Sequence, residues 1–263
     1  MVKSRSSRRQ EALIFFLLLC AFAAQAAFRG DGTAVRAYGY PTSTNLNCTN
    51  DITIACWIIK EAGFANASEF LNKGRNDNGN KANYAFRDDS AGGLELYWAN
   101  PDAGFHGIKS VTKCARTNTP IHIAVTHQFS GTNNSMFWID GSRANVQASF
   151  GTPQSNGAIT NASALTIMGY TGGQMMKGQI LEVAIFSTRL TAEEIATLAK
   201  GSMMDQVQNK GPLRQYLMGY WKFTEVPSWQ TVTGQAWNDY SGWNCHLTAT
   251  NSPASRPTIL SQP

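Results

Sequence analysis

The sequence predicts an all-β domain, a two-sheet antiparallel sandwich of short strands with one short helix near residues 191–200. Short runs rich in β-branched and aromatic residues recur along the chain, with turn-forming residues between them. Only 15% of the residues are charged, whereas 11% are aromatic and 23 are glycines, a balance that favours strands over helices. With 263 residues, 43% of them hydrophobic, the chain can bury a substantial core.

The individual elements follow from local patterns. The predicted strands occupy residues 52–59, 83–86, 94–98, 121–129, 136–139, 165–170, 179–186 and 217–223. Asp140-Gly141 is a tight-turn pair that ends one of these strands. The helix begins at a capping box, Thr191 to Glu194, in which each side chain satisfies an otherwise unpaired backbone N–H. Ile195 and Leu198 share one helical face, so this short helix needs another element to pack against.

Residues 1–26 have the pattern of a secretory signal peptide. Four basic residues precede an apolar run from Ala12 to Ala24, and Ala24-Gln25-Ala26 fits a cleavage site. The run is short for a membrane span, although an uncleaved anchor remains the alternative. Removing the segment leaves 18 basic and 16 acidic residues, a net charge of +2. We therefore expect a secreted or extracellular surface protein that has no nucleic-acid partner and no membrane span once the leader is cleaved.

Four cysteines remain after the leader is removed: Cys48, Cys56, Cys114 and Cys245. An even number in an exported chain predicts two disulfides, and the three possible pairings stay open. The spacing contains no C-x-x-C element, which argues against zinc.

Composition divides the mature chain into four parts. Residues 27–201 form the predicted sandwich core, and the polar stretch 202–215 is interpreted as a linker. Residues 216–250 supply a closing strand and an aromatic loop to the same domain, because so few residues cannot build a second core. The proline-containing end, 251–263, is expected to be loose.

Several motifs, in order and at consistent spacing, carry a resemblance to a known family. They are the segments Arg29–Thr33, Ile52–Lys60, Leu71–Gly74, Ile121–Thr126, Phe137–Gly141 and Gly178–Ile195. Together they make the chain similar to the LamG-like jelly-roll domains of the concanavalin A-like lectin and glucanase superfamily, over about residues 28–201. The segments 219–223 and 239–242 also look like family sequence, but in many relatives that part opens the domain. The resemblance implies a jelly roll.

No catalytic residue is predicted. Glucanases of this superfamily carry paired carboxylates two residues apart on one strand, and alternation places such pairs on one face. Glu69, Glu95 and Glu182 each lack an acidic neighbour at that spacing. His122 and His127 are five residues apart, so they face opposite sides of their strand and a structural role is favoured.

The resemblance implies calcium as the usual ion, and Asp31 and Glu182 are the candidate ligands that remain. Ala34 and Val35 replace acidic residues of the family pattern, and Leu181 replaces another. Calcium needs several clustered oxygen ligands, so backbone carbonyls would have to complete the site. The alternative is that Asp31 forms a turn and that Glu182 is a buried or paired carboxylate.

Aromatic residues gather in the polar tail and are the candidate ligand-binding residues: Trp229, Trp237, Tyr240 and Trp243. Exposed rings could stack on a sugar, whereas buried rings would hold the tail against the sandwich. The first hypothesis is a non-catalytic recognition module for a glycan or an extracellular surface protein, and it rests on the family resemblance. The alternatives are a structural or adhesive extracellular or particle-coat protein, and a glycan-cleaving enzyme whose site is not recognisable.

Overall fold

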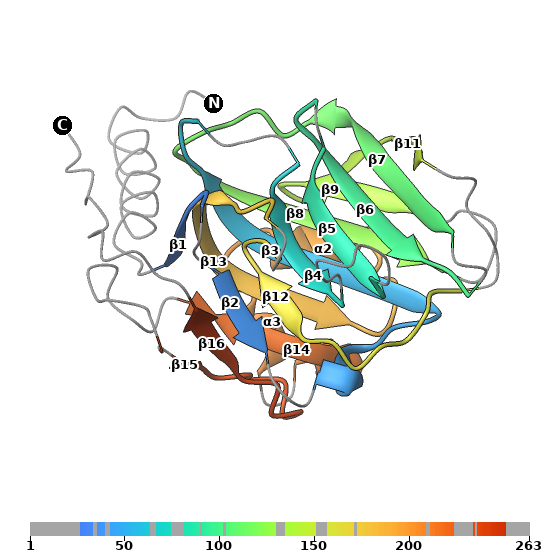
Figure 1. Cartoon of the computed structure of the whole chain (residues 1–263), viewed down its shortest axis with the longest axis vertical. Helices are drawn as coiled ribbons and strands as arrows, with labels where there is room; N and C mark the ends of the chain where they lie inside the picture. Colours follow the sequence, from blue (N-terminus) through green and yellow to red (C-terminus); the bar gives the residue numbers. More distant parts are fainter. Residues whose placement is uncertain are drawn as a thin grey trace, which may run out of the picture.

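The computed structural model describes residues 27–33, 36–39, 43–63, 67–74, 82–89, 91–101, 104–129, 135–150, 157–170, 173–208, 211–223, 234 and 236–250. These residues form two antiparallel sheets packed face to face, which confirms the predicted all-β sandwich (Figure 1). The predicted signal peptide and the end of the chain beyond residue 250 lie outside the described residues. No helix in the described part is long and apolar enough to cross a bilayer.

The first sheet has β13 and β3 at its centre. Its strand order is β1-β13-β3-β8-β9-β10, and β14 also pairs with β13. The bounds are β1 Phe28–Asp31, β3 Asp51–Lys60, β8 Pro120–Gln128, β9 Met136–Ile139, β10 Ser142–Ala144, β13 Lys177–Phe186 and β14 Leu217–Lys222. Asp140 and Gly141 join β9 to β10 with φ of 49° and 75°, as the predicted tight turn requires.

The second sheet lies on the other side of the core and has the order β11-β7-β6-β5-β4-β12-β2-β16-β15 (Figure 1). Its strands are β2 Arg36–Gly39, β4 Glu69–Lys73, β5 Tyr84–Asp88, β6 Gly93–Ala99, β7 Phe105–Lys113, β11 Val146–Phe150, β12 Leu165–Ile167, β15 Ala236–Trp237 and β16 Leu247–Thr250. Consecutive hairpins connect β4, β5, β6 and β7, so these four strands lie side by side.

Strand β3 shows why the first sheet is covered on both faces. Ile52, Ile54, Cys56 and Ile58 alternate toward the second sheet and belong to the main core. Trp57 points the other way, into a second apolar cluster formed with the helical segment. The nearly continuous burial of β3 follows from this double covering.

The helical layer contains α2 Ala192–Leu198 and α3 Met204–Val207, with the 3-10 turns η1 Ser43–Leu46 and η2 Arg214–Tyr216 elsewhere. The predicted capping box is present: Glu194 N–H donates to the Thr191 hydroxyl at 3.3 Å, and Thr191 N–H donates to Glu194 at 2.7 Å. Within residues 202–215, interpreted from the sequence as a linker, some side chains pack against the first sheet. Met203, Val207 and Leu213 are buried in the second cluster, because apolar residues spaced along this polar segment face the sheet.

The tail contributes strands to both sheets. β14 pairs with β13 in the first sheet, and β16 pairs with β2 in the second. Trp237 lies between them, with its ring centroid 4.6 Å from that of Phe28 and 5.2 Å from that of Phe223. This aromatic cluster joins the first strand of the chain to its tail.

The disulfide prediction is corrected by the structure. Cys48, Cys56, Cys114 and Cys245 are all buried, and no disulfide joins them in the described part of the chain. They come from separate elements, and the Cys48 thiol donates to the Asp51 carbonyl at 2.7 Å. Burial raises the pKa of Cys48 to about 12, which disfavours the reactive thiolate. The even cysteine count does not translate into pairs, because a count carries no information on proximity.

Candidate functional site

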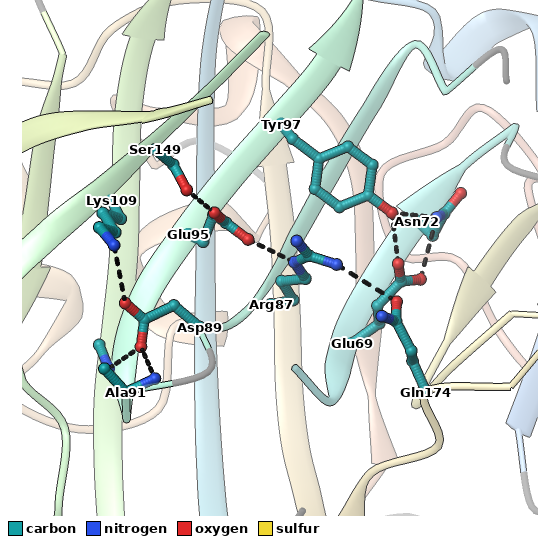
Figure 2. Close-up of polar contacts among 11 residues, drawn as sticks. Glu69, Asn72, Arg87, Asp89, Ala91, Glu95, Tyr97, Lys109, Ser149 and Gln174 are labelled. Atoms are coloured by element: carbon teal, nitrogen blue, oxygen red, sulfur yellow. Dashed lines mark hydrogen bonds and ion pairs between the residues drawn. The ribbon is translucent and has the colours of Figure 1, made fainter. Parts of the chain in front are cut away.

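A row of alternating charges crosses the outer face of the second sheet. Glu69 on β4 lies opposite Arg87 on β5, Arg87 lies opposite Glu95 on β6, and Glu95 lies opposite Lys109 on β7. Directly opposed residues on neighbouring strands have their side chains on the same face of the sheet. These four residues, called the charged row below, therefore form a line across four adjacent strands (Figure 2).

Arg87 is the centre of the charged row. Its Nε atom donates to Glu95, and its Nη1 atom donates to the side-chain oxygen of Gln174 at 3.4 Å. Its guanidinium carbon lies 4.7 Å from the centroid of the Tyr97 ring, a cation–π distance. Glu95 also accepts a hydrogen bond from the Ser149 hydroxyl, so the network reaches β11. The Arg87 side chain is 16% exposed, so it reaches solvent.

Glu69 is held by neutral donors. The Tyr97 hydroxyl donates to one carboxylate oxygen, and the Asn72 amide donates to the other at 2.9 Å. All three side chains are buried. Both oxygens of Glu69 act as acceptors, as a buried polar group requires.

Two further residues shape the edges of this face. Asp89 accepts from the backbone N–H groups of Ala91 at 2.8 Å and Gly93 at 2.6 Å, which orders the β5–β6 turn beside Lys109. Gln174 has φ of 51°, in the left-handed region that side chains such as glutamine rarely adopt. Its contact with Arg87 places this backbone outlier at the charged row (Figure 2), and such outliers are enriched at functional sites.

The face combines charged hydrogen-bonding groups with aromatic surface. Arg87 supplies donors, the carboxylates of Glu69 and Glu95 supply acceptors, and the ring of Phe105 packs against Tyr97 with centroids 6.3 Å apart. Phe105 is partly exposed. Such an arrangement can recognise a molecule that carries hydroxyl groups around an apolar ring face.

The predicted tail aromatics fall in different environments. Trp237 is 1% exposed and packs in the core, whereas Trp243 is 53% exposed with its indole N–H donating to the Leu217 carbonyl at 3.1 Å. Tyr240 is partly buried, and its ring centroid lies 6.2 Å from that of Tyr220. Trp229 lies outside the described residues. The three of these residues that the structure describes therefore do not form one exposed surface.

Asp31 and Glu182 are not brought together either. Asp31 accepts from the Thr33 amide at 2.8 Å and hydroxyl at 2.7 Å, forming a local turn. Glu182 accepts from the Ser202 hydroxyl at 2.7 Å, the Met203 amide at 2.7 Å and the Tyr220 hydroxyl at 2.8 Å.

The strand register explains the separation of the two carboxylates. Asp31 lies opposite Lys177 on β13, and Glu182 lies five residues further along that strand. At about 3.3 Å per residue, Glu182 is about 16 Å from Lys177 along β13. These two residues do not fit a shared calcium site. No cluster of three or more His, Cys, Asp or Glu side chains occurs among the residues that the structure describes.

The contacts of Glu182 predict its role in stability. Glu182→Ala should lower the free energy of unfolding by about 2–3 kcal/mol, because it leaves the buried Tyr220 hydroxyl and Met203 N–H without their acceptor. Urea denaturation followed by circular dichroism measures the change. Glu193→Ala, on the exposed side of α2, is the matched control and should change stability by less than about 0.5 kcal/mol. Equal effects of the two variants would contradict this assignment.

Comparison with known proteins then identifies the family. The profile of the Concanavalin A-like lectin/glucanases superfamily matches residues 31–196, more than half of the chain. The chain belongs to this superfamily. No curated protein sequence matches this chain.

Solved structures share the fold of this concanavalin A-like domain at low sequence identity. A Bacteroides ovatus protein, provisionally described as carbohydrate-binding, is 16% identical with a TM-score of 0.58; the match covers 90% of this chain and 62% of that one. The Ruminococcus gnavus IT-sialidase CBM40, bound to α2,3-sialyllactose, is 14% identical with a TM-score of 0.49, covering 66% of this chain and 97% of that one. A heptameric SAP-like pentraxin from Limulus polyphemus is 12% identical with a TM-score of 0.49, covering 88% and 97%.

Proposed function

We propose that this protein is an exported glycan-binding domain and that the outer face of the second sheet, around the charged row, holds the sugar. The arrangement of Arg87 between two carboxylates, with the rings of Tyr97 and Phe105 beside it, is the observation that carries the proposal. Membership of a lectin and glucanase superfamily supports it. The basic and apolar pattern of residues 1–26 supports export.

Each part of the face has a defined task in this proposal. Sugar hydroxyls accept hydrogen bonds from the partly exposed Arg87 guanidinium, which Glu95 holds in place, and charge-assisted hydrogen bonds are stronger than neutral ones. The partly exposed ring of Phe105 offers a flat apolar surface for the C–H face of a sugar. The proposal includes no catalysis, because the oxygens of Glu69 and Glu95 are engaged as acceptors and general acid catalysis needs a carboxyl group that donates a proton.

The test is a glycan array probed with the mature chain, followed by titration calorimetry on any glycan bound. Arg87→Ala should weaken binding about tenfold to a hundredfold, the equivalent of about 1.5–3 kcal/mol for hydrogen bonds from a charged group. Arg116→Ala is the matched control, since Arg116 forms an exposed ion pair with Asp140 away from this sheet face. It should bind like the unmodified chain.

Trp243 provides the rival location for the sugar. Its exposed ring lies in the tail, and Trp243→Ala should leave affinity unchanged if the charged row is the site. Loss of binding in Trp243→Ala together with normal binding in Arg87→Ala would overturn the proposed site. A blank array from folded protein would overturn glycan binding and favour a structural or adhesive role.

A further inference from the structure

We infer that the charged row selects uncharged glycans over glycans that carry a carboxylate, an inference that rests on the proposed glycan-binding function. The observation is the order of charges along the row. Arg87, its central cation, is flanked on both sides by carboxylates, Glu69 on β4 and Glu95 on β6. The other cation, Lys109, lies opposite Glu95 in the register and 4.0 Å from Asp89.

The contacts of Arg87 leave little room for an acidic group. Proteins that bind carboxylates strongly do so through the two-pronged edge of an arginine. Here the Nε atom donates to Glu95, the Nη1 atom donates to Gln174, and the planar group lies over Tyr97. A ligand carboxylate would have to displace Glu95 or bind beside it.

Burial makes that displacement unfavourable. The side chain of Glu95 is 4% exposed, and the carboxylate of Glu69 is fully buried. Moving an acidic ligand next to them brings like charges together where water screens them weakly. Releasing Glu95 from Arg87 would leave a buried carboxylate without its cation.

A neutral sugar brings no charge next to the buried carboxylates. A hydroxyl can accept a hydrogen bond from the Nη2 atom of Arg87, which makes neither of the contacts named above, so it leaves the pairing with Glu95 intact. The buried acids that repel a ligand carboxylate therefore do not oppose a ligand made of hydroxyls. In this account the row sets specificity through its two acids, and Arg87 both pairs with Glu95 and contacts the sugar.

The experiment compares neutral glycans with acidic counterparts that either replace a hydroxymethyl group by a carboxylate or carry one additional acidic sugar. The mature chain is titrated with lactose and sialyllactose, and with galactose and galacturonate oligomers of equal length, together with the neutral and sialylated members of the array. We expect the neutral member of any bound pair to bind at least tenfold more tightly. Glu95→Gln keeps the size of the side chain and removes its charge, so it should reduce this preference at least fivefold. Glu193→Gln on α2 is the charge-matched control and should keep the preference.

The outcomes distinguish the preference for neutral glycans from the proposed glycan-binding function. If the acidic member binds as tightly as its neutral partner, and Arg87→Ala abolishes that binding, the neutral preference is overturned while the proposed function stands. If no glycan of either kind binds, the proposed function is overturned and the preference with it. If Glu95→Gln does not fold, the ratio of affinities measured on the unmodified chain decides the inference alone.

Discussion

Trp237→Ala should lower the free energy of unfolding by about 3–5 kcal/mol, the range for truncating a large buried aromatic residue. The Trp237 ring is 1% exposed and packs against both Phe28 and Phe223, whose own centroids are 5.6 Å apart. Removing it opens a cavity where the N-terminal strand meets the tail. Urea denaturation monitored by circular dichroism gives the change.

Trp243 provides the internal comparison for this result. Its side chain is largely exposed and makes one hydrogen bond, so Trp243→Ala should cost less than about 1.5 kcal/mol. The two tryptophans come from the same loop-rich tail, and the sequence offers no means of separating them. Comparable losses from both variants would show that the tail packs differently from the structure described.

Acidification from pH 7 to pH 5 should lower the free energy of unfolding by about 2–3 kcal/mol. Burial lowers the pKa of both His122 and His127 to about 3, whereas an unfolded chain protonates histidine near its ordinary value of 6.5. Between these values the unfolded chain binds more protons than the folded chain, so stability falls as the pH falls. Each histidine contributes up to about 1.4 kcal/mol per pH unit.

Asp88 opposes part of this loss. Burial raises its pKa to about 6 although it is paired with Lys60. The folded chain therefore takes up a proton on Asp88 before the unfolded chain does, which stabilises the fold as the pH falls below about 6. The slope of the loss should increase from pH 7 to pH 6 and then stay near about 1.4 kcal/mol per pH unit, because protonation of Asp88 offsets about one of the two histidines. Urea titrations at half-unit intervals of pH measure the slope.

His122→Leu tests the assignment directly. Neither ring nitrogen of His122 has a hydrogen-bond partner within the described part of the chain, so the substitution removes no hydrogen bond. Stability at pH 7 should be retained or increased, because an unpartnered buried polar group is costly. The drop between pH 7 and pH 5 should shrink by about 2 kcal/mol. A variant that keeps the full drop would exclude His122 as its source.

The fold was accessible from the sequence because its strands are strongly patterned. β3, β8 and β13 contain long apolar runs, and the helix α2 begins at a capping box, so both element type and position follow from local signals. β7 was not predicted. Its sequence from Phe105 to Lys113 mixes glycine, histidine and lysine, and it forms a strand only because β6 and β11 pair with it on either side.

The candidate site was not accessible from the sequence for a related reason. In the sequence Glu69 and Glu95 each lack an acidic neighbour at two-residue spacing, yet the register of the β4–β5 and β5–β6 pairings places both opposite Arg87. Lys109 lies on the strand that sequence patterns missed. Charge alternation across strands depends on register, and bulges in β4–β5 and β6–β7 pairing shift that register by amounts that local patterns do not specify.

Strands from the early and late parts of the chain pair in both sheets, and this pairing has a consequence for biosynthesis. Phe28 on β1 pairs with Ile180 on β13, and Ala37 on β2 pairs with Ala249 on β16. The first sheet therefore cannot be completed until β14, which ends at Lys222, has left the ribosome, and the second sheet cannot be completed until residues near 250 have done so. Pairings of such long range make folding slow. Throughout translation the nascent chain has unsatisfied strand edges, so chaperones have a long interval in which to bind it, and any export machinery would meet a chain that has not yet folded.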